Sequence, residues 1–526
     1  MKRRILQAIR EGWTLPVFEY VKMEIFFKRI LTIYNVLDVF DLDAKSTVAL
    51  YGRNSSNWIA IYIACLIKGV RLLILHPNVN KLEAVHIMIL TNTNHIFADT
   101  DLISEELGRN VFLRTIISTE TLDVVYERND KSYFKALAEI LVSSEQNLNV
   151  DLRTLNTLFE EDDVTSSIIT ATSGTEYGEP KWVESDSYAI SDLLTRAMDV
   201  VPYGQIDKVY SQVEFAESHY LTVLLPFVKG CVFFGNKDDA EVIIEDTNSM
   251  EDMWRKNVSY LHGNRFLSFL FSVNWMYWLF ERIALRKVKN YYGKKLKSLV
   301  IYNSVISEGI LSVLVGKMPI YTTYGSQETN QLVAINDFSS LKKRLPYAVG
   351  NALPGLIIST NEDELEVSGK TLFNHYVGDA GYTREVRFRD NYVTGDIGFN
   401  DSASNVLYVF GRKSAIIQNE FKLPIQLDKL ERTLKSIPYF KDIIFLSRLE
   451  ERNGREIQEI TLLAYPDSTF VETKKLGMLR LKELMKVYQS KINFGIGPNI
   501  HIDNITIVDT PLLKTQDGKI CRYFYS

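Results

Sequence analysis

The chain has 526 residues, of which 46% are apolar and 24% are charged, the proportions of an ordinary soluble globular protein. At roughly 100–200 residues per domain, this length predicts two or three domains, and the composition excludes a disordered or fibrous chain. Acidic residues exceed basic ones and the formal net charge is −5, so the charge balance does not indicate a nucleic-acid partner. Cys65, Cys231 and Cys521 are as scattered as the seven histidines, which argues against a zinc site and suits a reducing compartment.

No apolar stretch near the N-terminus has the length of a signal peptide. The most apolar run, Phe266–Phe280, contains polar residues and is shorter than the ~20 residues needed to span a bilayer. We expect a buried helix there; an aromatic wall for an apolar ligand or a membrane-surface contact is the alternative. The sequence therefore predicts a cytoplasmic protein without a transmembrane segment.

Short β-rich runs alternate with helical patterns through the first two thirds of the chain. Helices are expected at Trp58–Lys68 and Lys81–Leu90. In chain order, strands are expected at Ser46–Tyr51, Arg71–Leu75, His95–Ala98, Ser166–Thr170, Lys208–Val213, Cys231–Phe234, Val242–Glu245 and Lys297–Tyr302. This alternation is typical of α/β units with largely parallel sheets.

The pattern changes after residue 347. Tyr347–Phe410 is rich in strand patterns and turn residues, and a smaller α+β unit follows Gly411. In this smaller unit, helices are expected at Leu427–Leu434 and Lys474–Gln489, and strands at Asp442–Leu446, Glu459–Ala464 and Ile505–Val508.

The segment TATSGTEYGEPK, which ends at Lys181, is the first with chemical content. Its hydroxyl groups, glycines and lysine are the groups that can surround phosphate oxygens. It does not match a Walker A loop, because two residues separate Gly178 from Lys181 and a tryptophan follows the lysine. Taken alone, the segment is equally compatible with an ordinary turn between a strand and a helix.

Four further segments follow in the order YGSQE at 324–328, YVTGD at 392–396, GRK at 411–413 and LKTQDGKICR at 513–522. Each segment taken alone has an ordinary explanation: the first could carry a surface charge, the second could be a turn, the third a strand end and the fourth a basic tail. Together with the loop, and in this order, they resemble the motifs of the adenylate-forming enzymes, which include acyl-CoA synthetases, adenylation domains and luciferases. The stretch Thr47–Ala98 also resembles the first α/β unit of that family, so the resemblance covers most of the chain.

The resemblance implies an α/β fold with two parts. Residues 1–411 would form a large ATP- and acid-binding domain of α/β sheets plus a distorted β-barrel, and residues 412–526 a mobile α+β lid. It also implies an AMP-forming acid–thiol ligase, which converts a carboxylic acid and ATP into an acyl-adenylate and pyrophosphate and then transfers the acyl group. The implied cofactors are ATP and Mg²⁺, with CoA or a phosphopantetheinylated carrier as co-substrate.

The same resemblance assigns roles to individual residues. The residues implied in phosphate binding are Thr172, Ser173, Gly174, Thr175 and Lys181. Glu328 would coordinate Mg²⁺, a hard cation that prefers oxygen ligands. Tyr324 would pack near the adenine, and Asp396 and Arg412 would contact the ribose. Lys519, carried by the lid, would bridge the attacking carboxylate and the α-phosphate.

The residues expected in the acid pocket are Phe215, His219, Asn303 and Ser304. Ala216 stands where amino-acid-activating members commonly have an aspartate for the α-ammonium group, so we expect an uncharged acyl or aryl acid, although Glu214 or Glu217 could substitute. Taken alone, His219 is more typical of a satisfied core or rim histidine, and a group that caps the pocket is the alternative.

The chain also departs from the family motifs, at Glu176–Tyr177 in the loop, Gln327, Asn303–Ser304, Ser414, Gln418–Lys422 and Leu513. Gln327 stands where the family usually has a threonine or serine hydroxyl, which predicts a weaker phosphate contact there. Three functions therefore remain open. The first is an acyl- or aryl-CoA ligase. The second is a free-standing enzyme that loads an acyl, aryl or amino acid onto a separate carrier protein, since the chain ends soon after Lys519. The third is a degenerate, non-catalytic nucleotide-binding protein.

Overall fold

The computed structural model of the chain describes residues 1–40, 42, 46–108, 110, 112–128, 152–160, 165–172, 180–259, 274–302, 306, 308–339, 347–418, 424–427, 431, 440–452, 455–467, 471–472, 477–496, 502–514 and 520–525. Several predicted site residues lie outside this part of the chain: Ser173, Gly174, Thr175, Asn303, Ser304 and Lys519. The departures at Glu176–Tyr177 and in residues 419–422 lie outside it as well, as does the apolar stretch up to residue 273.

The smaller of two large sheets has the strand order β19-β9-β8-β4-β3-β5-β6-β7. Strands β8, β4, β3, β5 and β6 run parallel to one another, whereas β7, β9 and β19 are antiparallel to their neighbours. The bounds are β3 (Thr47–Tyr51), β4 (Arg71–Leu75), β5 (Thr93–Ala98), β6 (Thr115–Ser118), β7 (Val124–Glu127), β8 (Ser167–Ala171), β9 (Trp182–Asp186) and β19 (His375–Tyr376).

Local sequence explains why these elements form. All five residues of β3 are buried, as in a strand that is covered on both faces. Helix α3 (Ser56–Lys68) begins after Ser55, whose hydroxyl accepts a hydrogen bond from the Trp58 backbone N–H. Helices α2 (Met23–Val39) and α3 pack together in the main core. The strands and both helices predicted in this region are confirmed to within two residues, the second helix as α4 (Lys81–Leu90).

The larger sheet joins a parallel half to an antiparallel half in the order β17-β18-β21-β22-β16-β15-β14-β13-β12-β10-β11-β1-β2. The parallel half consists of β1 (Pro16–Phe18), β10 (Lys208–Ser211), β11 (Val232–Phe233), β12 (Val242–Asp246), β13 (Ser298–Tyr302) and β14 (Ile320–Tyr324), and the short β2 (Val21–Lys22) pairs antiparallel with β1 at its edge. The antiparallel half consists of β15 (Ala334–Asp337), β16 (Ala348–Ala352), β17 (Ile357–Asn361), β18 (Glu364–Ser368), β21 (Asn391–Asp401) and β22 (Val406–Arg412). The strand- and turn-rich region predicted after residue 347 is this antiparallel half.

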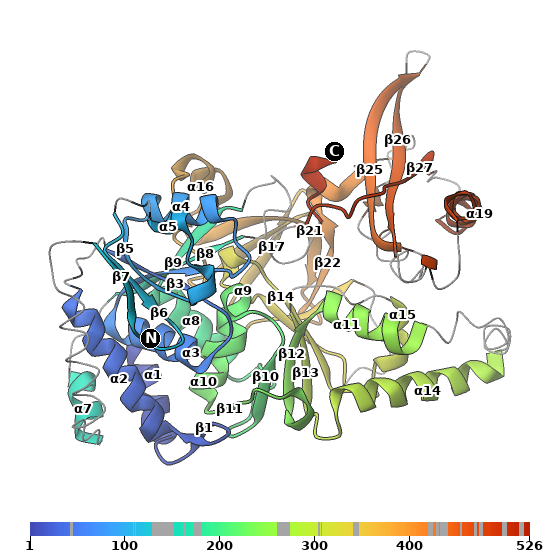
Figure 1. Cartoon of the computed structure of the whole chain (residues 1–526). Helices are drawn as coiled ribbons and strands as arrows, with labels where there is room; N and C mark the ends of the chain where they lie inside the picture. The colour runs from blue at the N-terminus through green and yellow to red at the C-terminus, as the bar shows by residue number, and fades with distance from the viewer. Residues whose placement is uncertain are drawn as a thin grey trace.

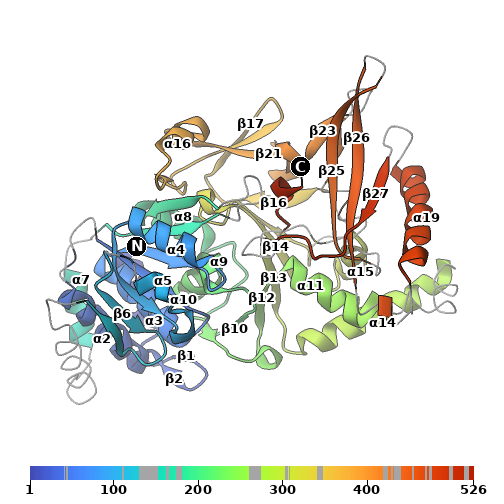
Figure 2. The same ribbon diagram turned by 45° about the horizontal axis from the view of Figure 1, so that its top comes forward.

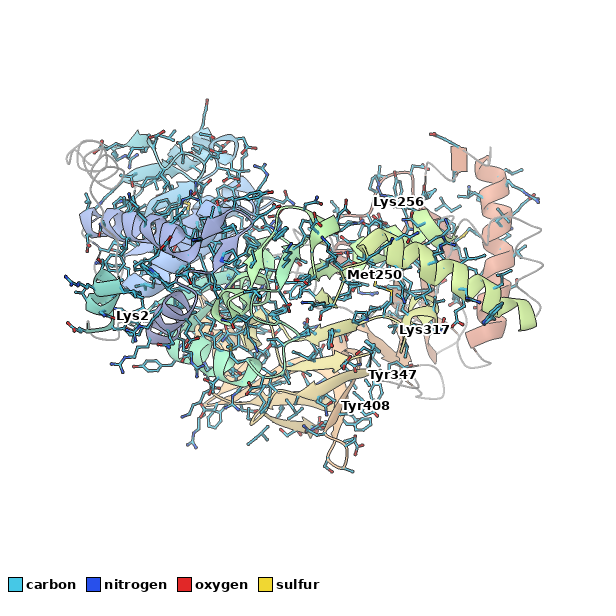
Figure 3. The ribbon with its side chains drawn as sticks, turned by 90° about the horizontal axis from the view of Figure 1, so that it is seen from below. Lys2, Met250, Lys256, Lys317, Tyr347 and Tyr408 are labelled. Carbon is cyan, nitrogen blue, oxygen red and sulfur yellow. The ribbon has the colours of Figure 1, made fainter. Side chains whose placement is uncertain are left out.

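Helices cover one face of the parallel half. A second core there includes residues of α11 (Thr247–Trp254), α14 (Asn274–Tyr292) and α15 (Glu308–Leu314), and Figure 3 shows this layer from below with Met250 on α11. Helix α14 confirms a helix over the described end of the apolar stretch. Phe280 is buried in it, but Trp278 and Leu279 are exposed. The prediction of a buried helix is therefore wrong for part of this end of the stretch.

The C-terminal unit has its own sheet and core. Strands β25 (Phe440–Arg452), β26 (Arg455–Pro466) and β27 (Asn504–Ile507) form a three-stranded sheet, and helix α19 (Met478–Ile496) packs on it through Leu481 and Met485. Figures 1 and 2 show this sheet standing apart from the two large sheets. The three strands and the second helix predicted here are confirmed; most of residues 427–434 lies outside the described residues. Among the described residues, no helix combines the length and apolarity that crossing a bilayer requires.

Candidate active site

The glycine-rich loop connects two antiparallel strands, β8 and β9, so it is a strand-to-strand connection and not a turn into a helix. Its two ends are held together at the base. The Thr172 backbone N–H donates to the Lys181 carbonyl at 2.7 Å, and the Lys181 N–H donates to Thr172 Oγ1 at 2.9 Å. The base of the loop is therefore fixed by the sheet, and residues 173–179 between these ends lie outside the described residues.

The side chain of Lys181 lies against an aromatic pair. Its Nζ is 2.9 Å from the ring centroid of Tyr382 and 5.6 Å from that of Tyr376, and the two rings are 5.2 Å apart. Tyr382 belongs to α16 (Ala380–Val386). Cation–π attraction stabilises an ammonium group in this position, so the positive charge is kept beside the loop.

Glu328 lies in a tight 3-10 turn, η5 (Gln327–Thr329), which follows β14. The chain reverses there, and a Cβ on Gly325 would lie 2.5 Å from the backbone carbon of Gln331, a distance that only glycine tolerates. Glu328 is 8% exposed, and its carboxylate accepts a hydrogen bond from Tyr376 Oη at 2.7 Å. The turn thus presents a buried carboxylate that already has a donor on one oxygen.

Asp396 is the centre of a second cluster. Tyr324 Oη donates to Asp396 Oδ2 at 2.5 Å, and Arg412 Nε lies 3.2 Å from Asp396 Oδ1. Asp396 and Arg412 are register partners on β21 and β22, while Tyr324 ends β14. Burial and the neighbouring Asp396 raise the pKa of Tyr324, so its hydroxyl remains a donor. Three predicted site residues from separate motifs are brought together here.

Gly395 allows this arrangement. Its φ is +74°, and a Cβ there would lie 3.3 Å from Arg412 Nη1. Arg412 Nη1 also donates to the Thr394 carbonyl at 2.6 Å. The TGD sequence therefore supplies a left-handed backbone, an anchor for the guanidinium group and the central carboxylate.

Gln327 connects three segments. Its Oε1 accepts from Thr170 Oγ1 at 3.1 Å on β8 and from Gln331 Nε2 at 3.0 Å. Its Nε2 donates to the Glu217 carbonyl at 3.1 Å. The Gln327 side chain, which replaces the family's usual hydroxyl residue, therefore connects strand β8 to the segment that carries Phe215 and His219.

A family model described as AMP-binding enzyme matches residues 26–371. The chain belongs to the AMP-binding enzyme family. No curated protein matches it in sequence, and solved structures resemble it in fold at low identity.

Three of these solved structures match over almost their whole length. The anthranilate CoA ligase AuaEII in complex with anthranoyl-AMP has a TM-score of 0.72 and 11% identity, over 99% of this chain and 96% of that one. The o-succinylbenzoate CoA synthetase MenE from Bacillus subtilis, in complex with OSB-AMP, has a TM-score of 0.72 and 13% identity, over 99% and 97%. The amide bond synthetase McbA from Marinactinospora thermotolerans has a TM-score of 0.72 and 15% identity, over 100% and 98%. At these identities the likeness shows a shared fold.

In this AMP-binding enzyme, the predicted pocket residues Phe215 and His219 lie in the short helix α9 (Phe215–His219). His219 is fully buried, its Nδ1 shares a hydrogen bond of 2.9 Å with Tyr62 Oη, and burial lowers its pKa to about 3. It is therefore neutral. This environment favours the core-histidine interpretation, and a role in the acid pocket stays a prediction.

Sequence reasoning missed two aromatic residues of the site, Tyr376 and Tyr382. Strand β19 brings Tyr376 beside β9, with Tyr376 opposite Val183, and no local pattern in the sequence predicts that pairing. Polar pairing between the Gln327 and Gln331 side chains was also not foreseen. Their spacing of four residues was the available signal, but the turn between them is not a regular helix.

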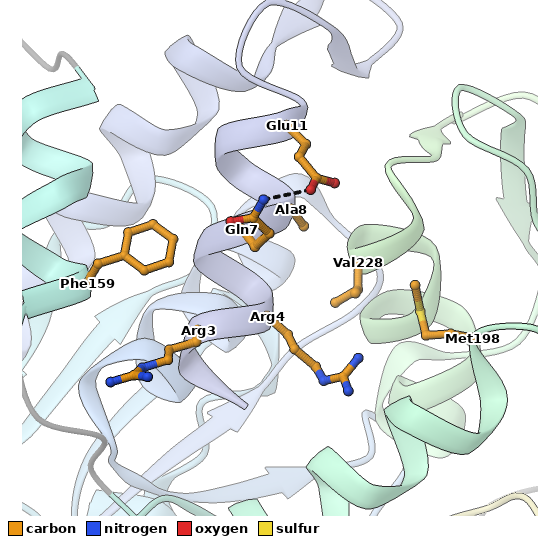
Figure 4. Close-up of a pocket in the computed structure, with 8 residues that line it drawn as sticks. All are labelled: Arg3, Arg4, Gln7, Ala8, Glu11, Phe159, Met198 and Val228. Atoms are coloured by element: carbon orange, nitrogen blue, oxygen red, sulfur yellow. Dashed lines mark hydrogen bonds between the residues drawn. The ribbon is translucent and has the colours of Figure 1, made fainter.

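A surface pocket of about 440 Å³ lies over α1 (Lys2–Glu11). Figure 4 shows its lining residues: Arg3, Arg4, Gln7, Ala8, Glu11, Phe159, Met198 and Val228. None of them belongs to the five motifs, so this pocket is separate from the candidate site.

Proposed function

We propose that this AMP-binding enzyme adenylates a carboxylic acid with ATP and then transfers the acyl group to the thiol of CoA. A carboxylate oxygen attacks the α-phosphorus and pyrophosphate leaves. The thiol then attacks the acyl carbonyl and AMP leaves with that oxygen. The observation that carries the proposal is the convergence of Tyr324, Asp396 and Arg412 in one cluster and of Lys181 and Glu328 around Tyr376 in another. Residues of these types are suited to bind and position a nucleoside triphosphate.

The Asp396 cluster suits the ribose of ATP. A carboxylate accepts two hydroxyl hydrogen bonds well, and the donors Tyr324 Oη and Arg412 Nε hold it in one orientation. We infer that Asp396 accepts from the ribose hydroxyls and that Arg412, at the end of β22, contacts the same sugar.

The residues around Tyr376 suit the phosphates and Mg²⁺. Glu328 is a hard oxygen donor in a nearly buried position, which fits Mg²⁺. Among the described residues, no group of three His, Cys, Asp or Glu side chains could hold a metal ion, so phosphate oxygens and water would complete the coordination. Bound Mg²⁺ would supply charge neutralisation, while Lys181 would add a second positive charge beside the loop.

We further propose that residues 412–526 form the lid that carries Lys519. The ends of the segment around it meet on the small unit: Lys514 and Ile520 form an antiparallel bridge, and Lys514 Nζ binds Asp442 Oδ1 at 2.7 Å. An ion pair of 3.9 Å between Arg255 and Asp467 joins the small unit to the body. Such a long, partly exposed ion pair contributes little, as a moving lid requires.

The acid is proposed to be an uncharged acyl or aryl acid. Ala216 is buried and offers no charge to an α-ammonium group. Glu214 immediately precedes α9, and burial raises its pKa, which disfavours its charged form. A carboxylic acid without an amino group therefore fits this region best.

Acid-dependent exchange between ATP and labelled pyrophosphate tests the proposal. Fatty, aryl and amino acids are supplied in turn to the full chain and to Lys519→Ala. We expect exchange with at least one fatty or aryl acid and a loss of at least a hundredfold in the variant. If the chain binds ATP but no acid supports exchange, it is a non-catalytic nucleotide-binding protein.

The acceptor is tested with the acid so found. Thioester formation is compared between free CoA and a panel of phosphopantetheinylated carrier proteins. We expect CoA to be acylated. Acylation of a carrier protein alone would replace the ligase proposal with the carrier-loading function.

A further inference from the structure

Tyr376 lies between two residues that the proposed function requires. Its hydroxyl donates to Glu328 Oε1 at 2.7 Å, and its ring centroid is 5.6 Å from Lys181 Nζ. We propose that Tyr376 is a positioning residue that holds the Glu328 carboxylate in the orientation that binds Mg²⁺. This inference rests on the proposed function. It adds that Tyr376 determines how much Mg²⁺ the enzyme needs for ATP binding.

The backbone around Tyr376 is fixed on the side of the phosphate loop. Tyr376 pairs with Val183 on β9, two residues after Lys181, and the Val377 N–H donates to the Trp182 carbonyl at 2.8 Å. The Tyr376 N–H donates to Thr383 Oγ1 at 3.0 Å on α16. The position of the ring relative to the loop is thus set by the sheet and by a helix.

The same segment is also fixed on the side of Glu328. The Phe373 N–H donates to the Glu328 carbonyl at 2.9 Å, and the rings of Phe373 and Tyr376 lie 4.9 Å apart. Tyr376 itself is 3% exposed. Because both the backbone of Glu328 and the hydroxyl of Tyr376 are held by one short segment, the carboxylate has little freedom to rotate.

The chemistry of the contact suits a metal ligand. A hydroxyl satisfies one oxygen of a buried carboxylate without neutralising its charge, so the full negative charge remains for a cation. In this contact the Tyr376 hydroxyl is the donor and the carboxylate the acceptor. With Oε1 engaged, Oε2 would be the oxygen that binds the metal. Residues that hydrogen-bond to a metal-binding side chain commonly tune affinity in this way.

The test is a Mg²⁺ titration of ATP binding by calorimetry, with ATP and MgCl₂ as the probes. Tyr376→Phe keeps the ring and removes the hydroxyl. We expect the Mg²⁺ concentration for half-maximal ATP binding to rise about 10- to 100-fold, with full ATP affinity restored at saturating Mg²⁺. When Tyr376→Phe is added to a Glu328→Gln variant, it should not shift the Mg²⁺ midpoint any further. Tyr408→Phe, which removes a hydroxyl from a ring stacked on Phe399, is the matched control and should leave the midpoint unchanged.

An unchanged midpoint in Tyr376→Phe, with Mg²⁺-dependent binding in the wild type, overturns the inference alone. So does a loss of ATP affinity that saturating Mg²⁺ does not restore, because that result means a packing role. If the wild type binds no ATP, the proposed function fails and the inference with it. If Tyr376→Phe does not fold, Thr383→Val removes the acceptor of the Tyr376 N–H instead. Its midpoint should rise roughly threefold, and an unchanged value overturns the inference.

Discussion

Tyr324 and Asp396 are 72 residues apart in the chain, yet the tyrosine hydroxyl donates to the aspartate carboxylate at 2.5 Å. The contact joins the end of the parallel half of the larger sheet to its antiparallel half. Arg412 lies on the other carboxylate oxygen. A carboxylate held by two donors at the junction of two half-sheets is the feature from which the nucleotide-binding proposal starts.

The first prediction concerns this carboxylate. Asp396→Asn removes the charge that pairs with Arg412 and reduces the acceptor capacity offered to the ribose. We expect ATP affinity, measured by calorimetry, to fall about 10- to 100-fold, since hydrogen bonds to charged groups contribute roughly 1.5–3 kcal/mol. Asp401→Asn on the same strand, where the carboxylate's hydrogen bonds to described residues are to its own turn, should bind ATP like the wild type. Equal affinities for the two variants would remove Asp396 from the nucleotide site.

A second prediction concerns the backbone at Gly395. Because its φ is +74° and a Cβ would lie 3.3 Å from Arg412 Nη1, Gly395→Ala should lower the free energy of unfolding by roughly 1–2 kcal/mol and weaken ATP binding. Urea denaturation and calorimetry measure the two effects. Gly108→Ala is the control, because a Cβ there meets nothing within 4 Å. Equal stability of both variants would contradict the role of the left-handed backbone.

A third prediction concerns the departure at Gln327. Gln327→Thr restores the type of residue common in the family but loses the bond to the Glu217 carbonyl and the contact with Thr170. We expect the variant to lose about 1–3 kcal/mol of unfolding free energy in urea denaturation. Gln7→Ala, which removes an exposed bond to Glu11, should change stability by no more than about 0.5 kcal/mol. A Gln327→Thr variant as stable as the wild type would show that the bridge contributes nothing.

A fourth prediction is a pH dependence. Glu245 is fully buried in the second core, Tyr292 Oη donates to its Oε1, and burial raises its pKa to about 8. The folded state therefore keeps a proton that the unfolded chain releases near pH 4.3. Stability should fall as pH rises between these values, by on the order of 3–5 kcal/mol.

The substitution Glu245→Gln isolates this effect. It removes the titration, so the gain in stability over the wild type should grow from pH 4.5 to pH 8 and then stay constant. Thermal unfolding midpoints across this pH range measure it, with Glu11→Gln on an exposed helix position as the control. Parallel pH curves for the wild type and Glu245→Gln would contradict the raised pKa.

Sequence patterns predicted the parts of the fold that local physics determines. The buried run of β3 and the capped helix α3 are examples, because continuous apolar residues and a serine cap specify their own conformations. The strand β1 (Pro16–Phe18) was not foreseen. It pairs with β11 more than two hundred residues away, and such a partner leaves no mark on a three-residue segment.

The residues of the candidate site also fall into those that the sequence predicted and those that it did not. Tyr324, Asp396 and Arg412 were predicted from their motifs, and the structure brings them together. Tyr376 was missed, because its role depends on the pairing of β19 with β9 and on the fold of the turn at Glu328. A weaker phosphate contact at Gln327 stays a prediction, and the bridge that its side chain makes between segments was not foreseen.

The most direct test of the central claim follows one oxygen atom. A carboxylic acid that supports pyrophosphate exchange is labelled with ¹⁸O in both carboxylate oxygens and incubated with the enzyme, ATP, Mg²⁺ and CoA, and the nucleotide products are analysed by mass spectrometry. Attack on the α-phosphorus followed by thioester formation predicts AMP that carries one ¹⁸O atom. ADP as the product with ¹⁸O in inorganic phosphate, or AMP without the label, would contradict adenylation of the acid.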